Sequence, residues 1–151
     1  ESVIRNLKEV TDSKGLNISC DLADMRELPY DNEAFDCILA YHAIYHADTS
    51  SMECIISEMK RVLKNEGEIF VTFNSKNSPS FKDSRHERID NNSIIKKEGI
   101  EKDIPHYYAD SEEIRRLLHG FKFIRLRQIE DIYEDGNGWH YFVHAKKVCE
   151  K

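Results

Sequence analysis

Two short apolar runs joined by a polar loop constrain the fold of this chain more than any other feature. They are Ile18 to Leu22 and Phe35 to Ala40, within the stretch from Asn17 to His46. The proline and the Asp-Asn pair between them favour a turn, so the runs predict two strands of one α/β sheet. The second run is apolar on both faces, as in a parallel strand buried between helix layers. Open α/β sheets bind ligands where their strands end, so we expect functional residues there.

Helical and strand patterns alternate on either side of this stretch. Apolar residues between Val3 and Val10 recur at helical spacing, and residues 12–15 supply a stop. Ser50 and Glu53 have the form of a capping box for a second helix. That helix carries a regular apolar stripe, which we interpret as core and which consists of Met52, Ile55, Ile56, Met59, Val62 and Leu63. The run from Ile69 to Phe73 predicts a third strand.

The segment from Asn74 to Tyr108 differs from the rest because it is polar and has no sustained period. We expect it to be a long loop with one short helical or strand piece around Ser93 to Ile95. Long loops in small domains are often lids or binding loops, so residues 75–108 are the predicted lid or substrate segment.

The C-terminal part predicts a helix and a hairpin. Asp110 and Glu113 cap the helix, and Gly120 closes it. Phe121 to Ile132 and Trp139 to Lys146 then read as two strands, because the Asp-Gly-Asn-Gly run at residues 135–138 is a strong hairpin turn.

Composition excludes several classes of partner. The 151 residues are 40% hydrophobic and 33% charged, with a net charge of −6, which suits one soluble domain and argues against nucleic acid. No run is long enough to span a membrane and no signal peptide is visible, so we expect a cytoplasmic protein without a membrane partner. The four cysteines lie far apart and suggest neither a zinc site nor a disulfide framework.

Three short motifs stand in a fixed order along the chain. Asp24-Met25 precedes the RELP run at residues 26–29, and Phe35-Asp36 opens the second apolar run. Glu58 is followed by RVLKNEG at residues 61–67 and then by a strand. With the closing hairpin, these motifs resemble the C-terminal two-thirds of a class I S-adenosylmethionine-dependent methyltransferase of the small-molecule type. The resemblance implies an α/β fold, a partial Rossmann-like sheet that is mostly parallel and ends in an antiparallel hairpin.

The sequence departs from that family in two places. Asn65 and Glu66 replace a proline and a glycine of the family's turn, and a Glu held in a left-handed conformation costs about 1 kcal/mol. The family's N-terminal glycine-rich loop is absent, as is the acidic residue that takes the ribose hydroxyls. The one GxG, at residues 136–138, precedes a strand and belongs to the hairpin turn.

The resemblance therefore implies a single methyltransferase-like domain over residues 1–151, truncated at its N-terminus. The two strands that the family places between the Ile18 strand and the Phe35 strand are not in the sequence. Exposed strand edges invite pairing with a second chain, so we expect a homodimer.

The resemblance also implies which residues contact S-adenosylmethionine. Asp24 is expected to accept a hydrogen bond from the adenine amino group, and the Met25 backbone to meet the ring. Ala40, Tyr41 and Tyr45 are expected near the sulfonium and amino acid portion, because an aromatic face suits a cation. The alternatives are a solvated or helix-capping Asp24 and aromatic side chains that simply pack over the sheet edge.

The candidate catalytic residues are His46, His106 and Tyr107, as bases on the substrate side, since histidine titrates near neutrality. His106 and Tyr107 stand just before a predicted helix, where the resemblance implies a lid over the substrate. For each of them a solvated loop residue is the alternative. The strand from Trp139 to Tyr141 either lines the same pocket or belongs to the core. No histidine or cysteine pair has metal-ligand spacing, so we expect no metal.

Two functions stay open on the sequence alone. The first is S-adenosylmethionine-dependent methyl transfer to a small-molecule acceptor, which would be the chain's partner. The second is a non-catalytic α/β interaction module or one part of a split methyltransferase, inactive by itself. A hydrolase is a weaker hypothesis, because the chain has neither a GxSxG nor a paired-carboxylate motif.

Overall fold

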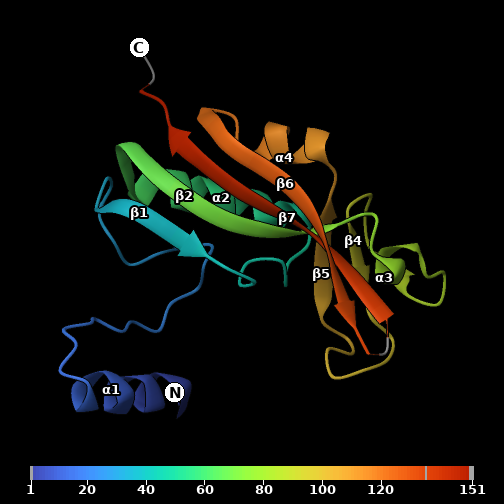
Figure 1. Cartoon of the computed structure of the whole chain (residues 1–151), viewed down its shortest axis with the longest axis horizontal. Helices are drawn as coiled ribbons and strands as arrows, with labels where there is room; N and C mark the ends of the chain where they lie inside the picture. The colour runs from blue at the N-terminus through green and yellow to red at the C-terminus, as the bar shows by residue number, and fades with distance from the viewer. Residues whose placement is uncertain (1, 135, 150–151) are drawn as a thin grey trace.

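A curled, mixed seven-stranded sheet forms the centre of the computed structural model, which describes residues 2–134 and 136–149 (Figure 1). The strands are β1 (Phe35–Ala40), β2 (Leu63–Ser75), β3 (Glu87–Arg88), β4 (Ser93–Ile95), β5 (Pro105–Ala109), β6 (Phe121–Tyr133) and β7 (Gly136–Lys147). Their order is β3-β4-β5-β2-β7-β6, and β1 also pairs with β2. β1 and β5 run parallel to β2, whereas β7 and β6 close the sheet antiparallel. The α/β class and the C-terminal hairpin are confirmed.

Two of the four helices cover one face of the sheet (Figure 1). The helices are α1 (Ser2–Ser13), α2 (Thr49–Val62), α3 (Pro79–Lys82) and α4 (Ser111–Leu117). The core cluster joins α2 and α4 to alternate residues of β2 and β7, which are Ile69, Val71, Phe73, Val143 and Ala145. We call this the covered face. The apolar stripe of α2 is buried as predicted.

The helix starts are set by aspartates. Asp110 caps α4 as expected, accepting hydrogen bonds from the backbone N–H groups of Glu112 and Glu113. For α2 the predicted capping box is wrong, because Asp48 is the N-cap and accepts from the Ser51 N–H at 2.8 Å. An aspartate side chain can accept from the free N–H groups of the first helical turn just as a serine can. The observed cap, Asp48, lies two residues before the predicted one, Ser50.

The first part of β2 contains an irregularity in its pairing, and the predicted backbone strain lies there. Glu66 has φ 64°, so the left-handed position that the family gives to glycine is occupied by a glutamate. The register between β1 and β2 shifts here, with Phe35 opposite Leu63 but Cys37 opposite Glu68. Gly67 is required at this close approach, because an added Cβ would lie 2.8 Å from the Leu63 side chain.

The predicted strand from Ile18 to Leu22 is wrong. Residues 16–23 form no strand, and the side chains of Ile18 and Leu22 are 51% and 73% exposed. A strand needs a neighbour for its backbone N–H and C=O groups, and β1 does not lie beside this segment (Figure 1). The segment instead runs as an extended connection to α1, whose existence is confirmed but whose Leu7 and Val10 stay about half exposed.

The strand from Phe35 to Ala40 forms as predicted, but only one of its faces is buried. Ala40 is 7% exposed, whereas Leu39 is 74% exposed. Leu39 pairs with Phe70, and both point to the side of the sheet opposite α2. A shallow groove of about 270 Å³ lies there, lined by residues that include Leu39, Tyr41, Phe70, Phe142 and His144. We call this side the open face.

The polar segment is more ordered than the predicted long loop. Its expected short piece at Ser93–Ile95 is β4, and the segment also contains α3, β3 and β5. β4 pairs antiparallel with β5, which joins β2 at Asn74 and Ser75. These strands are short and β3, β4 and β5 pair with their neighbours in the sequence. They therefore contain no long apolar run that sequence analysis could detect.

The hairpin forms with a tighter turn than expected. Tyr133 pairs with Gly136, so the strands pair up to these two residues, and Asp135 of the predicted turn lies outside the described residues. Among the helices that the structure describes, none is long and apolar enough to cross a membrane.

Candidate functional site

Two cavities lie near the ends of the strands, and together they contain most of the predicted site residues. The Asp24 cavity measures about 430 Å³ and is lined by Asp24, Met25, Arg26, His46, Ala47, Asp48, Ser51, Ile55 and Pro105. The His140 cavity measures about 240 Å³ and is lined by residues that include Tyr45, Lys96, Glu101, His106, Tyr108 and His140. His46 and Tyr45 are neighbours in the chain, so one loop contributes to both cavities.

The carboxylate of Asp24 is fixed by a local turn. Its Oδ1 accepts from the Arg26 backbone N–H at 2.8 Å, and its Oδ2 pairs with the Arg26 guanidinium at 2.7 Å. These bonds lower the pKa of Asp24 to about 2, so the group is an acceptor at neutral pH. Met25, Ala47 and Ile55 contribute apolar side chains to the lining, and the last two are almost fully buried. The cavity thus combines a fixed hydrogen-bond acceptor with an apolar surface.

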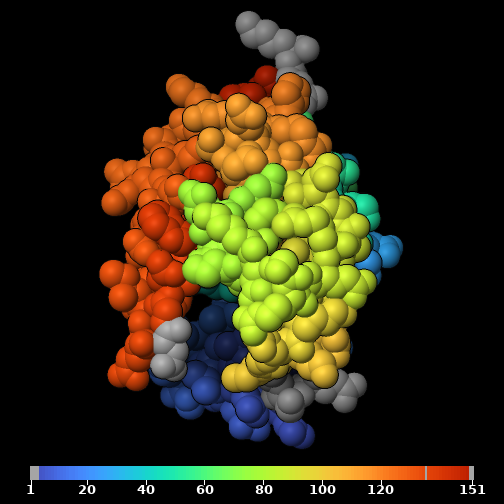
Figure 2. Space-filling model, turned by 90° about the vertical axis from the view of Figure 1, so that its right-hand side faces the viewer, coloured from blue at the N-terminus to red at the C-terminus, as the bar shows by residue number. Residues whose placement is uncertain are grey.

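The His140 cavity lies between the lid segment and the tip of the β6–β7 hairpin. Figure 2 shows the yellow-green residues of that segment and the orange-red residues of the hairpin on either side of a hollow. Ser78 ties the two sides together, since its Oγ donates to the Trp139 carbonyl and accepts from the Trp139 N–H, both at 3.0 Å. The cavity walls are polar, with serine, tyrosine and histidine side chains.

A histidine–carboxylate pair stands on the hairpin wall. His140 Nδ1 lies 2.5 Å from Asp131 Oδ2, and the histidine is only 9% exposed. The carboxylate can only accept, so Nδ1 donates to it and the orientation of the ring is fixed. Among the described residues, none makes a hydrogen bond to Nε2.

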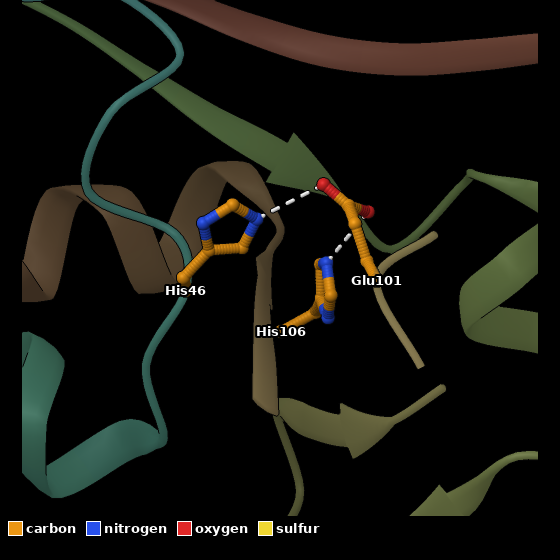
Figure 3. A group of neighbouring side chains, drawn as sticks. All are labelled: His46, Glu101 and His106. Carbon is orange, nitrogen blue, oxygen red and sulfur yellow. Dashed lines mark hydrogen bonds and ion pairs between the residues drawn. The ribbon is translucent and has the colours of Figure 1, made fainter. Parts of the chain in front are cut away.

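A second group joins the two cavities, and Figure 3 shows it. The Glu101 carboxylate lies between two imidazoles, with Oε1 3.1 Å from His46 Nε2 and Oε2 2.8 Å from His106 Nε2. His46 lines the Asp24 cavity, whereas Glu101 and His106 line the His140 cavity. We call these three residues the His46–Glu101–His106 cluster.

The surroundings of the cluster set its charges. Burial raises the pKa of Glu101, but hydrogen bonds from Lys96, His106 and His46 outweigh it and bring the pKa to about 2. Burial lowers the pKa of His106, which is only 1% exposed. Lys96 Nζ lies 2.5 Å from Glu101 Oε2, the oxygen that also faces His106, and its positive charge lowers the pKa of the carboxyl.

Three predicted residues lie outside the two cavities. Ala40 is buried in the core, and Tyr41 lies in the open-face groove with 61% of its surface exposed. Tyr107 is fully buried, and its hydroxyl donates to Glu113 at 2.6 Å. Burial and this partner raise its pKa well above the usual range, which makes Tyr107 a structural residue in this arrangement.

Glu101 and Asp131 were missed as site residues by sequence reasoning, whereas His140 lies in the strand for which a pocket-lining role stayed open. Glu101 lies in a polar segment with no motif, so nothing in the sequence marks it. The hairpin did hold a signal for the pair of Asp131 and His140. Its register places Asp131 opposite Gly138, diagonal to His140 on the same face, where long side chains meet.

Comparisons with known proteins agree with this architecture. A family model described as a methyltransferase domain matches residues 1–71, and no curated protein matches the chain. A S-adenosylmethionine-dependent methyltransferase structure from Methanosarcina mazei aligns with 99% of this chain and 79% of its own, at 19% identity and TM-score 0.77. One from Clostridium acetobutylicum aligns with 99% and 72%, at 12% identity and TM-score 0.71.

A third similar structure contains bound small molecules. It is the Burkholderia thailandensis 1,6-didemethyltoxoflavin-N1-methyltransferase with its substrate and S-adenosylhomocysteine, which aligns with 95% of this chain and 56% of its own, at 11% identity and TM-score 0.61. At identities this low, structural similarity establishes the fold alone. The chain therefore has the fold of the class I S-adenosylmethionine-dependent methyltransferases, and its residues 1–71 match a methyltransferase domain model.

Proposed function

We propose that this protein transfers the methyl group of S-adenosylmethionine to a small-molecule acceptor. One observation carries the proposal: the Asp24 cavity, which has the acceptor and apolar wall that an adenine needs, is joined to a polar cavity by the His46–Glu101–His106 cluster. Cofactor and acceptor would then occupy neighbouring cavities, as an in-line displacement requires.

The residues of the Asp24 cavity fit the adenine end of the cofactor. The two oxygens of the Asp24 carboxylate can accept about four hydrogen bonds. Arg26 occupies some of these acceptor positions, and another can accept from the exocyclic amine of adenine. Met25, Ala47 and Ile55 supply apolar contacts for the ring. Tyr45, at the edge of the second cavity, is placed to offer an aromatic face to a sulfonium. Contacts from Ala40 and Tyr41 stay a prediction of the family resemblance.

The cofactor supplies an activated methyl group on a positively charged sulfur. The chain's own residues have to hold the acceptor in line with that methyl group, keep water out and take up the acceptor's proton. The walls of the His140 cavity are polar and would orient the acceptor by hydrogen bonds. At about 240 Å³ the cavity is smaller than most ligand sites, which favours a small acceptor.

His140 is the side chain best arranged to take the proton. His140 lines the cavity, its neutral form offers Nε2 as an acceptor, and Asp131 would stabilise the imidazolium that forms. His106, a candidate from the sequence, has both ring nitrogens engaged, with Nδ1 2.9 Å from the Ile104 carbonyl and Nε2 against Glu101. His46 and His106 would therefore act on the acceptor from the opposite wall, through the cluster.

Calorimetric titration with S-adenosylhomocysteine tests the proposal. We expect micromolar binding by the wild-type chain and at least about tenfold weaker binding by Asp24→Ala, which loses a charged hydrogen-bond partner. Asp83→Ala is a matched control, because Asp83 makes the same bonds to the N–H and guanidinium of Arg85 and lies outside both cavities. Binding that both variants weaken equally would overturn the assignment.

A second function is favoured by a specific observation. Among the described strands β1 pairs only with β2, so its other edge is available to a partner. Such a chain could serve as a non-catalytic interaction module or as one part of a split methyltransferase. Absence of heat in the same titration would support this second function over the first.

A further inference from the structure

We propose that His46, Glu101 and His106 bind one divalent zinc ion. Their ligand atoms, two imidazole nitrogens and a carboxylate oxygen, all lie within 4.8 Å of one another. The proposal concerns these side chains alone and does not depend on methyl transfer.

The geometry is close to what the ion requires. Zinc bonds of 2.0–2.1 Å in a tetrahedral arrangement set neighbouring ligand atoms about 3.3 Å apart. The two nitrogen–oxygen distances here are 3.1 and 2.8 Å, so small side-chain rotations suffice for those pairs. His46 comes from the loop after β1, Glu101 from the loop before β5, and His106 from β5 itself. Figure 3 shows the three side chains converging. Two histidines and a carboxylate are a ligand set of catalytic zinc sites, which keep a fourth position open.

The hydrogen bonding of His106 orients its ring toward the cluster. Its Nδ1 lies 2.9 Å from the Ile104 carbonyl, which can only accept, so Nδ1 carries a proton. This bond leaves Nε2 facing Glu101 Oε2 at 2.8 Å, which is the nitrogen that would bind a metal ion. A ligating histidine commonly donates its other N–H to a backbone carbonyl, as His106 does.

The open side of the cluster faces the cavities. The side chains of His46 and Glu101 are each 39% exposed, whereas His106 is 1% exposed. An ion held there has room for water or for an acceptor oxygen as its remaining ligand, and this last role rests on the proposed function. Nitrogen ligands select zinc over magnesium and calcium, which prefer oxygen.

Lys96 is the feature of the site that opposes the ion. Its Nζ lies 2.5 Å from Glu101 Oε2 and places a positive charge near any bound cation. The carboxylate has lone pairs on both sides, so Lys96 and a metal can share it. Removing the lysine charge should therefore strengthen zinc binding, a result that an ordinary ion pair between Lys96 and Glu101 does not predict.

Calorimetric titration of the chelator-treated full chain with zinc chloride, and with cobalt(II) as a spectroscopic probe, tests the site. We expect one zinc ion per chain, binding at least about tenfold weaker in His46→Ala and in Glu101→Gln, and several-fold tighter in Lys96→Met. His119→Ala is the control, since His119 is exposed and lies outside the cluster. These variants avoid the buried His106, and circular dichroism confirms that each is folded.

The cobalt complex identifies the ligands. Visible bands without an intense sulfur charge-transfer band indicate nitrogen and oxygen ligands, whereas such a band indicates the free cysteines instead. Absence of saturable binding, or equal binding by wild type, His46→Ala and Glu101→Gln, would overturn the proposal. Asp24→Ala should bind zinc normally and Glu101→Gln should bind S-adenosylhomocysteine normally, so the two proposals fail separately.

Discussion

The two faces of the sheet are made by the same strands but differ in what covers them. On the covered face Ile69, Val71 and Phe73 are at most 2% exposed under α2 and α4. On the open face Leu39 and Phe70 are 74% and 38% exposed, and no helix among the described residues packs on them. The open face also carries His140, which the register with Asn74 places on the side of Phe70. Stability therefore belongs mainly to the covered face, whereas the open face carries the candidate base His140.

The largest expected effect is on the covered face. Phe73→Ala removes a fully buried ring from the core and should lower the free energy of unfolding by about 3–5 kcal/mol. Phe70→Ala, three residues earlier and on the open face, is the matched control and should cost below about 1 kcal/mol. Urea unfolding measures both. Equal losses would mean that the two faces are packed alike.

The next effect concerns chemistry on the open face. With an acceptor found by screening small phenols, thiols and amines, His140→Gln should lower kcat by about 100- to 10,000-fold, because it removes the base. His144→Gln is the control, since His144 lies on the same strand and face, with its Nε2 2.8 Å from Glu68, but outside the His140 cavity. Formation of S-adenosylhomocysteine measures the rate. An unchanged kcat in His140→Gln would mean that another group takes up the proton of the acceptor.

A smaller effect is expected where α2 holds the polar loop before β1. Arg61 donates to the Leu28 and Tyr30 carbonyls and pairs with Glu58, which also accepts from the Leu28 N–H at 2.8 Å. Glu58→Gln should cost about 1–2 kcal/mol of unfolding free energy at pH 7, since it weakens charge-assisted hydrogen bonds.

This loss should depend on pH in a defined direction. The Arg61 guanidinium and the Leu28 N–H lower the pKa of Glu58 from 4.5 to about 2. The stability from Glu58 is therefore fully present above pH 4.5 and is lost as the pH falls toward 2. Urea unfolding of wild type and Glu58→Gln at pH 7, 4 and 3 should show curves that converge. A constant difference would contradict the lowered pKa.

The smallest effect is expected at the edge of the open face. Leu39→Ser should change the unfolding free energy by only about 0.5 kcal/mol, because the side chain is already exposed. The homodimer expected from the sequence stays a prediction, and light scattering of this variant beside wild type tests it. A dimer that needs the open face should dissociate, and a wild-type monomer would remove the expectation.

Much of the fold could be predicted because local patterns and tertiary packing agree in it. The stripe of α2, the Phe35 strand and the Ser93 piece all lie where their apolar residues indicate. The Ile18 run failed because a strand requires a neighbour, which periodicity does not report. Part of the candidate site could be predicted, because Asp24, His46 and His106 each stand in or beside a stretch that sequence analysis singles out. Glu101 and the Asp131–His140 pair depend on how the lid segment folds back and on hairpin register, which are long-range properties.

The most direct test of the central claim is photochemical labelling with S-adenosylmethionine that carries a radioactive methyl group. Ultraviolet irradiation, proteolysis and peptide mapping would locate the bound cofactor in the wild-type chain. We expect label on the peptides that contain Met25 and residues 47–55, suppressed by excess S-adenosylhomocysteine and lost in Asp24→Ala but not in Asp83→Ala. Label on the open-face peptides around Phe70 and Phe142, or label that excess S-adenosylhomocysteine does not suppress, would contradict the claim.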